Sequence, residues 1–199
     1  MTPKKSIKKD KNDFPVMEFP TQKKWHQWLS KNHATFEGIW LKFHKKHSGL
    51  KSINYAEAVE EALCFGWIDG QAKPFDENSW IQKFTPRRSK SIWSKRNIER
   101  VTQLIEQGRM KPAGLKEIEA AKADGRWQKA YDSPGNMTAS EDFLKRLNKN
   151  KKAKQFFESL NKTNKYAINW RLQTAKKPET REKRMKAIIE MLAKGEKFH

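Results

Sequence analysis

The chain has 199 residues, a formal net charge of +20 and only 36% hydrophobic residues. This length suffices for one larger domain or two small ones, and eight Trp and eleven Phe supply bulk for a core. No stretch approaches the roughly 18 apolar residues of a membrane span. No apolar segment follows the basic N-terminus, as it would in a secretory signal. We therefore expect a folded protein with neither a membrane span nor a leader.

The positive charge is concentrated in three segments. Residues 1–13 carry five Lys against two Asp, residues 81–111 carry nine Lys or Arg against two Glu, and residues 140–199 carry seventeen against seven. The stretches between them are balanced. Because a general solubility device would spread its charge more evenly, this placement favours particular surfaces that attract anions.

Cys64 is the only cysteine, which excludes an internal disulfide and a thiolate cluster for zinc. It lies in the apolar run 62–67, a context typical of a buried, inert thiol rather than of a nucleophile. A single thiol fits a reducing compartment, and we expect the protein to be cytoplasmic.

The first elements in chain order are a tail, a helix and a strand. Residues 1–13 have almost no apolar content and are predicted to be a disordered basic tail. A helix is predicted from Thr21, whose side chain can cap it, to about Asn32. The mixture of aromatic and branched residues over 36–44, with partial alternation, then favours a strand.

A second helix and a hairpin follow. Asn54 and Glu57 are three residues apart, as in a capping box, and Gly66 is the expected end of that helix. Two further strands are predicted around 67–73 and 80–85. Because the segment between them is rich in turn residues, we expect an antiparallel hairpin.

Helices are predicted to resume after Ser91 or Ser94, and the last helix is predicted to start near Pro178 and to end at Gly195. Residues 131–138 contain a Pro-Gly turn and form the expected linker. Ser140 is the expected cap of the next helix. Apolar residues at helical spacing mark the helices: Ile98, Val101, Leu104 and Ile105; Leu115, Ile118 and Ala121; Phe143, Leu144 and Leu147; Phe156, Phe157 and Leu160; Tyr166 and Trp170; Met185, Ile188, Ile189 and Leu192.

These elements predict an α+β fold, with a small antiparallel sheet and packed helices in the N-terminal part and only helices in the C-terminal part. After the tail, we expect an α+β domain over 14–139 and a helical domain over 140–199. The last helix should dock through its apolar stripe. The predicted N-terminal core consists of Trp25, Trp28, Trp40, Leu63, Phe65, Trp67 and Ile98.

Several long strings resemble the YdeI/OmpD-associated family, also labelled bacteriocin-protection proteins. The strings that carry the resemblance are residues 54–59, 62–70, 84–95, 108–114, 124–127 and 175–181. The resemblance implies tolerance of bacteriocins or antimicrobial peptides and association with an outer-membrane porin. It assigns no catalytic residue. The lack of a secretory signal departs from the periplasmic placement that the family name suggests.

The main candidate site is the basic segment from Thr85 to Asn97. It lies at a predicted helix start, where backbone N–H groups and the positive end of the dipole favour an anion. Arginine adds a planar fork suited to phosphate or carboxylate. The alternative is a solvated loop in which Trp93 only packs on the core. The predicted anion-binding residues are Arg87, Arg88, Lys90, Ser91, Ser94 and Lys95, with Asp69, Lys73 and Trp93 as accessory residues.

Other polar residues favour structural interpretations. Asp69 could orient a substrate group beside Lys73, but a structural salt bridge is the preferred interpretation. His44 and His47 are three apart, with two lysines between them that would oppose a divalent cation. The sequence contains no phosphate-loop or dinucleotide motif, and we predict no metal, no cofactor and no catalytic residue.

The favoured hypothesis is a binding protein, rather than an enzyme, that engages an anionic small molecule or an acidic macromolecule through its basic surfaces. One alternative is an enzyme acting on a phosphorylated or carboxylated small molecule held by residues 87–94. Another is sequence-independent nucleic-acid binding by the basic C-terminal helices, with Tyr166 and Trp170 as stacking platforms. Burial of these two rings in the core is the preferred interpretation.

Overall fold

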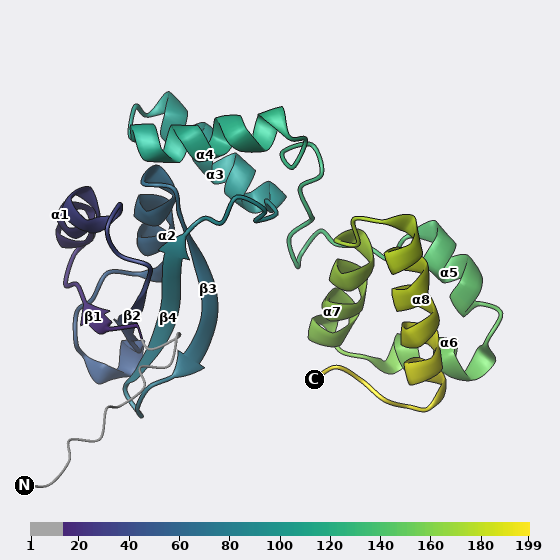
Figure 1. The fold of residues 1–199 in the computed structure, drawn as a ribbon. Helices are drawn as coiled ribbons and strands as arrows, with labels where there is room; N and C mark the ends of the chain where they lie inside the picture. Colours follow the sequence, from purple (N-terminus) through teal and green to yellow (C-terminus); the bar gives the residue numbers. More distant parts are fainter. Residues whose placement is uncertain (1–13) are drawn as a thin grey trace, which may run out of the picture. The chain divides into compact units, whose positions relative to one another are not determined.

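The structure is a computed structural model that describes residues 14–199. The predicted tail over 1–13 lies outside the described residues. The chain divides into two compact units: the first holds the described residues up to Ser91 together with Glu99–Gly125, and the second holds Ile92–Ile98 and Arg126–His199. The predicted α+β fold is confirmed, with the sheet in the first unit and helices in the C-terminal part (Figure 1). The domain boundary between residues 139 and 140 stays a prediction.

The described residues form one four-stranded sheet with the order β1-β2-β4-β3. Its strands are β1 (Val16–Glu18), β2 (Ile39–His44), β3 (Trp67–Pro74) and β4 (Ser79–Pro86). Strands β3 and β4 form the predicted antiparallel hairpin, and β2 pairs antiparallel with β4. Strand β1, parallel to β2, is not among the predicted strands, because three residues are too few to show an alternation.

The helices that contain residues of the first unit are α1 (Gln22–Asn32), α2 (Tyr55–Cys64), α3 (Lys95–Glu106) and α4 (Pro112–Ala123), and a short 3-10 turn covers Lys46–Ser48. Two of the predicted caps are confirmed: the Thr21 hydroxyl accepts from the Lys24 N–H at 3.3 Å, and Asn54 forms a complete capping box with Glu57. Gly66 ends α2 with a φ of 73°, which favours glycine.

The core of the first unit is built from aromatic side chains. Trp25 is fully buried, and its indole N–H donates to the Ala58 carbonyl at 3.1 Å, which ties α1 to α2. Trp28 stacks on Trp25 with ring centroids 5.4 Å apart but is only half-buried. The predicted burial is confirmed for Trp25, Trp40, Leu63, Phe65 and Trp67, whereas Trp28 and Ile98 are partly exposed.

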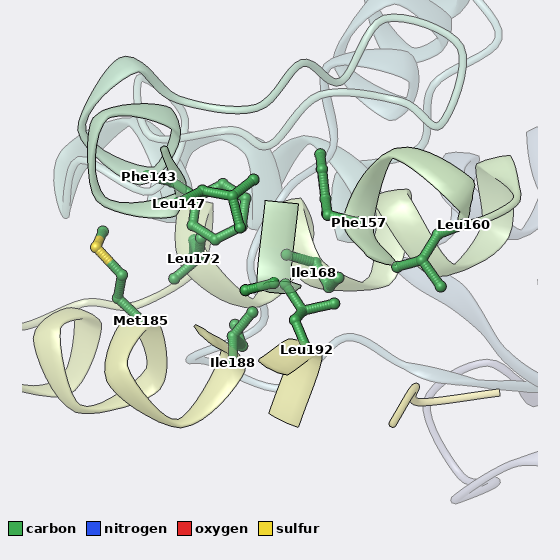
Figure 2. Close-up of a cluster of buried hydrophobic side chains, with 10 residues drawn as sticks. Phe143, Leu147, Phe157, Leu160, Ile168, Leu172, Met185, Ile188 and Leu192 are labelled. Atoms are coloured by element: carbon green, nitrogen blue, oxygen red, sulfur yellow. The ribbon is translucent and has the colours of Figure 1, made fainter. Parts of the chain in front are cut away.

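The second unit packs helices around an aliphatic core (Figure 2). Its C-terminal helices are α5 (Glu141–Leu147), α6 (Lys151–Ser159), α7 (Lys162–Gln173) and α8 (Pro178–Ala193). The predicted docking of the last helix is confirmed: the core contains Phe143, Leu147, Ala153, Phe157, Leu160, Ile168, Leu172, Met185, Ile188 and Leu192, with Ile189 packed against it.

One predicted cap differs in detail. Ser140 occupies the position before α5, but its hydroxyl bonds no N–H of that helix. It accepts instead from Nη2 of Arg181 on α8 at 2.8 Å, because docking of α8 brings a charged donor within reach. Within residues 14–199, no helix combines the length and the apolar character that crossing a membrane requires.

Candidate anion-binding site

In the first unit, the predicted anion-binding loop contains one buried arginine and two solvated cations. Arg87 is only 7% exposed, and its backbone N–H donates to the Gly66 carbonyl at 2.9 Å. The Arg88 N–H donates to the Ser91 hydroxyl at 3.2 Å, which closes a tight turn. The side chains of Arg88 and Lys90 are exposed. Of these three cationic side chains, Arg88 and Lys90 are therefore the two that an anion from solvent can reach.

Three of the predicted residues, Trp93, Ser94 and Lys95, belong to the second unit. The Ser94 hydroxyl accepts from the Asn97 N–H at 3.1 Å and so caps α3 itself. Lys95 Nζ lies 2.6 Å from Asp132 Oδ1, and this hydrogen bond lowers the pKa of the Asp132 carboxyl. Trp93 is 1% exposed. We also expect from the sequence that Arg87 or Arg88 converges with Ser91 or Ser94 on one small volume, and this stays a prediction.

The two accessory residues on β3 contact different aromatic side chains. The Tyr55 hydroxyl donates to Asp69 Oδ2 at 2.5 Å, and Lys73 Nζ lies 4.3 Å from the centroid of the Trp40 ring. The pairing with β4 is irregular between Asp69 and Ala72. The preferred interpretation, a structural salt bridge of Asp69 and Lys73 with each other or with the nearby arginines, stays a prediction.

The first unit carries a basic groove that the sequence analysis did not single out. We call it the lysine groove; its volume is about 780 Å³. It lies where α1 and α2 begin and where the chain leaves β2. The residues that define its character are the lysines Lys23, Lys45, Lys46 and Lys51, the aromatic residues Phe43, Tyr55 and Trp80, and the helix caps Thr21 and Asn54.

The lysines of the groove are largely available to an anion. Lys45 Nζ donates to the backbone carbonyl of Glu77 at 3.0 Å. Lys23, Lys46 and Lys51 are exposed and form no ion pair within the described part of the chain. The lining also includes the carboxylate of Glu57, but one of its oxygens accepts from the Asn54 N–H at 3.1 Å in the capping box. Because four lysines stand against this one carboxylate, the described lining carries a net positive charge.

Stacked rings line the wall of the lysine groove. Phe43 and Trp80 are stacked with centroids 4.5 Å apart, and Tyr55 lies 6.1 Å from Trp80. Phe43 is buried, whereas Tyr55 and Trp80 are partly exposed. Partly exposed rings offer a surface to the apolar or aromatic portion of a ligand whose charge meets the lysines.

His44 adds a polar group to the same lining. Its side chain is 7% exposed, and its Nε2 lies 2.8 Å from Glu18 Oε1. Its Nδ1 is buried without a hydrogen-bond partner among the described residues. Leaving such a group unsatisfied costs about 1–3 kcal/mol.

A second charged cluster in the first unit is structural. Glu61 is buried, and its carboxylate lies 2.7 Å from both His26 Nδ1 and Arg109 Nη2 and 2.8 Å from Gln22 Nε2. Burial opposes its ionisation, but these hydrogen bonds outweigh burial, and the pKa of Glu61 is lowered. The cluster joins α1, α2 and the segment after α3.

Neighbouring Cys64 is buried, as predicted, and burial raises the pKa of its thiol to about 12. The thiolate that a nucleophile requires is therefore strongly disfavoured. Within residues 14–199, no group of three or more His, Cys, Asp or Glu side chains is placed to hold a metal ion.

Comparisons with known families match the two ends of the chain separately. Residues 17–117, slightly more than half of the chain, match a family described as a domain of unknown function (DUF8412). Residues 136–195 match the family described as "Bacteriocin-protection, YdeI or OmpD-Associated", which confirms the resemblance. Of the strings that carry it, 175–181 lies in this second match. No curated protein and no solved structure matches the chain.

Proposed function

We propose that this chain is a binding protein rather than an enzyme. It belongs to the DUF8412 family and carries a bacteriocin-protection, YdeI or OmpD-associated module. It contributes to tolerance of bacteriocins or antimicrobial peptides by engaging an anionic small molecule or an acidic macromolecule. It does so in the lysine groove and acts in the cytoplasm, where a reduced Cys64 is expected.

One observation carries this proposal: three exposed lysines line a groove beside partly exposed aromatic rings, and no carboxylate neutralises them within the described residues. The two helices that begin at the groove direct the positive ends of their dipoles to it. This field adds to the attraction that Lys23, Lys46 and Lys51 exert on an anion.

Charge also indicates how tolerance would arise. Antimicrobial peptides that lie on membranes are rich in Lys and Arg, and a chain with a net charge of +20 repels them. Direct capture of such peptides is therefore disfavoured. The protein would act instead on an anionic component of the cell. This component is one that the antimicrobial peptide also binds, or one whose concentration determines how the cell responds to the peptide.

Calorimetric titration of the full chain with inorganic tripolyphosphate tests the site. The double variant Lys46→Ala/Lys51→Ala should bind at least tenfold more weakly, since each charge-assisted hydrogen bond is worth about 1.5–3 kcal/mol. The matched control Lys24→Ala/Lys116→Ala removes two exposed lysines of the same unit that do not line the groove. It should leave the affinity within about twofold.

Equal losses in both double variants would mean diffuse attraction to a basic surface and would overturn the assignment of the groove. In cells that rely on this protein for tolerance, the Lys46→Ala/Lys51→Ala variant should lose protection and the control should keep it. Protection that persists without groove binding would separate tolerance from this site and contradict the proposal.

A further inference from the structure

The second unit contains a hollow of about 400 Å³ whose lining is mostly apolar. Its lining includes four apolar residues and two arginines: Trp170, Ile188, Met191 and Phe198, with Arg171 and Arg184. A volume of this size lies within the usual range of about 300–1,000 Å³ for small-molecule sites, which are apolar with a few placed polar groups.

Residues of the hydrophobic core of the unit form part of the wall of the hollow. Ile188 is 3% exposed and belongs to the core cluster, in which Figure 2 shows it on α8. Met191 and Phe198 are partly buried and pack against the same cluster. An apolar chain or ring placed here would extend the core and lose contact with water, which is the main source of apolar binding energy.

Two arginines at this hollow are held in fixed positions by backbone carbonyls. Arg171 Nη1 donates to the Ala167 carbonyl at 2.9 Å, and its guanidinium lies 3.8 Å from the centroid of the Phe198 ring. Arg184 Nη1 donates to the Arg171 carbonyl at 2.7 Å. A guanidinium has five N–H donors, so each arginine keeps further donors for a ligand.

These arginines differ from their neighbours in lacking an acidic partner. Arg181 of α8 pairs with Asp142 of α5, and Arg146 of α5 pairs with Glu182 of α8. No carboxylate lies within 4 Å of Arg171 or of Arg184 among the described residues. Two uncompensated guanidinium groups beside an apolar wall complement an anion that carries an apolar tail.

We infer that this hollow binds a small amphipathic carboxylate, a free acid with a medium-length apolar chain. Its carboxylate accepts hydrogen bonds from Arg171 and Arg184, and its chain lies against Trp170, Ile188 and Met191. This hollow is smaller than the lysine groove of the first unit, and its lining is more apolar.

Octanoate, at concentrations below micelle formation, is the probe, and octanol is its uncharged counterpart. Titration calorimetry of the full chain should give saturable binding of one octanoate, with octanol at least tenfold weaker. The ratio follows because octanol lacks the carboxylate and so cannot form the two charge-assisted hydrogen bonds to the arginines. Similar affinities for the two ligands would overturn the proposal.

Arg184→Met should weaken octanoate at least tenfold and leave octanol unchanged. Lys183→Met is the matched control: it removes a positive charge from the adjacent, exposed position of α8, which does not line the hollow. An equal loss in both variants would indicate general attraction to a basic protein and would contradict the site. Circular dichroism and thermal melting establish that each variant is folded.

Arg171→Met provides an independent variant should Arg184→Met fail to fold, with the same expected loss for octanoate. A short peptide that ends in an apolar residue presents the same chemistry from a different source. If the peptide binds at the hollow and octanoate does not, the free acid is the wrong ligand and the inference fails as stated.

Discussion

The two units use aromatic, aliphatic and charged side chains in different ways. The first unit buries Trp25 and Trp67, whose indole N–H groups are hydrogen-bonded, and it contains a charged cluster around Glu61. The second unit buries mostly aliphatic side chains and keeps ion pairs such as Arg181 with Asp142 near its surface. The stability of the first unit should therefore depend on individual polar contacts, whereas that of the second should depend mainly on buried apolar area.

The largest expected effect is that of Trp25→Ala. It removes a fully buried ring and leaves the Ala58 carbonyl without its side-chain donor, so the free energy of unfolding should fall by about 3–5 kcal/mol. Leu192→Ala in the second core should cost about 2–5 kcal/mol by loss of packing alone. Chemical denaturation of both variants checks the comparison, and a loss below about 1 kcal/mol for Trp25→Ala would contradict the assigned core.

Glu61→Gln tests the buried charged cluster. Because the folded-state pKa of Glu61 is lowered, its contribution is fully present above the unfolded-state pKa of about 4.3. The contribution disappears as the pH falls through the folded-state value. At pH 7 the variant should lose about 1–3 kcal/mol, and its stability should depend less on pH in the acidic range.

The surface counterpart is Arg181→Ala, which should cost about 1 kcal/mol or less. The measurement is a set of denaturation curves for both variants and the wild type. The curves are recorded from about pH 3 to about pH 7, a range that includes the reference carboxyl pKa. A Glu61→Gln variant with unchanged pH dependence would show that the cluster does not stabilise the fold.

Gly114→Ala probes the close approach of α4 to α2. A Cβ at this position would lie 2.4 Å from the Cys64 carbonyl oxygen and 2.7 Å from that of Leu63. Because backbone must shift to admit it, we expect a loss of about 1–3 kcal/mol. Gly135→Ala meets no atom within 4 Å and should change stability by about 0.5 kcal/mol or less. Similar melting temperatures for the two variants would contradict the close packing.

The last pair of variants concerns the predicted loop. Arg88→Ala removes an exposed side chain and should change stability by about 0.5 kcal/mol or less. Arg87→Ala removes a buried one and should cost about 1–3 kcal/mol. Thermal melting measures both. If Arg87→Ala leaves stability unchanged and weakens binding of tripolyphosphate, the loop is the anion site and the lysine groove is not.

What the sequence predicted well is encoded locally. Asn54 and Glu57 are three residues apart, so their capping box is visible without any tertiary contact. The start of α8 at Pro178 and the turn at Gly195 are similarly local. Burial is less local: Ile105 belongs to a predicted apolar face but is 44% exposed, because periodicity does not say which part of a face is covered.

The lysine groove could not be predicted in the same way. Lys23 precedes α2 by some thirty residues, and it meets Lys46 and Lys51 only through the packing of α1, α2 and β2. In the sequence, the lysines beside His44 indicated only that a metal ion would be repelled. The sequence did show Lys51 close to the Asn54 cap. It did not show that Lys23 of α1 lies beside the same helix start, and this tertiary contact is what forms the groove.

Mapping the bound anion by NMR tests the central claim most directly. The full chain, labelled with ¹⁵N, is titrated with inorganic tripolyphosphate while backbone amide shifts are followed. The lysine groove predicts saturable shifts at Thr21 to Lys23, at Lys45 and Lys46, and at Lys51 to Asn54. Shifts confined to Arg88 to Ser91, or spread evenly over the basic surface of both units, would contradict it.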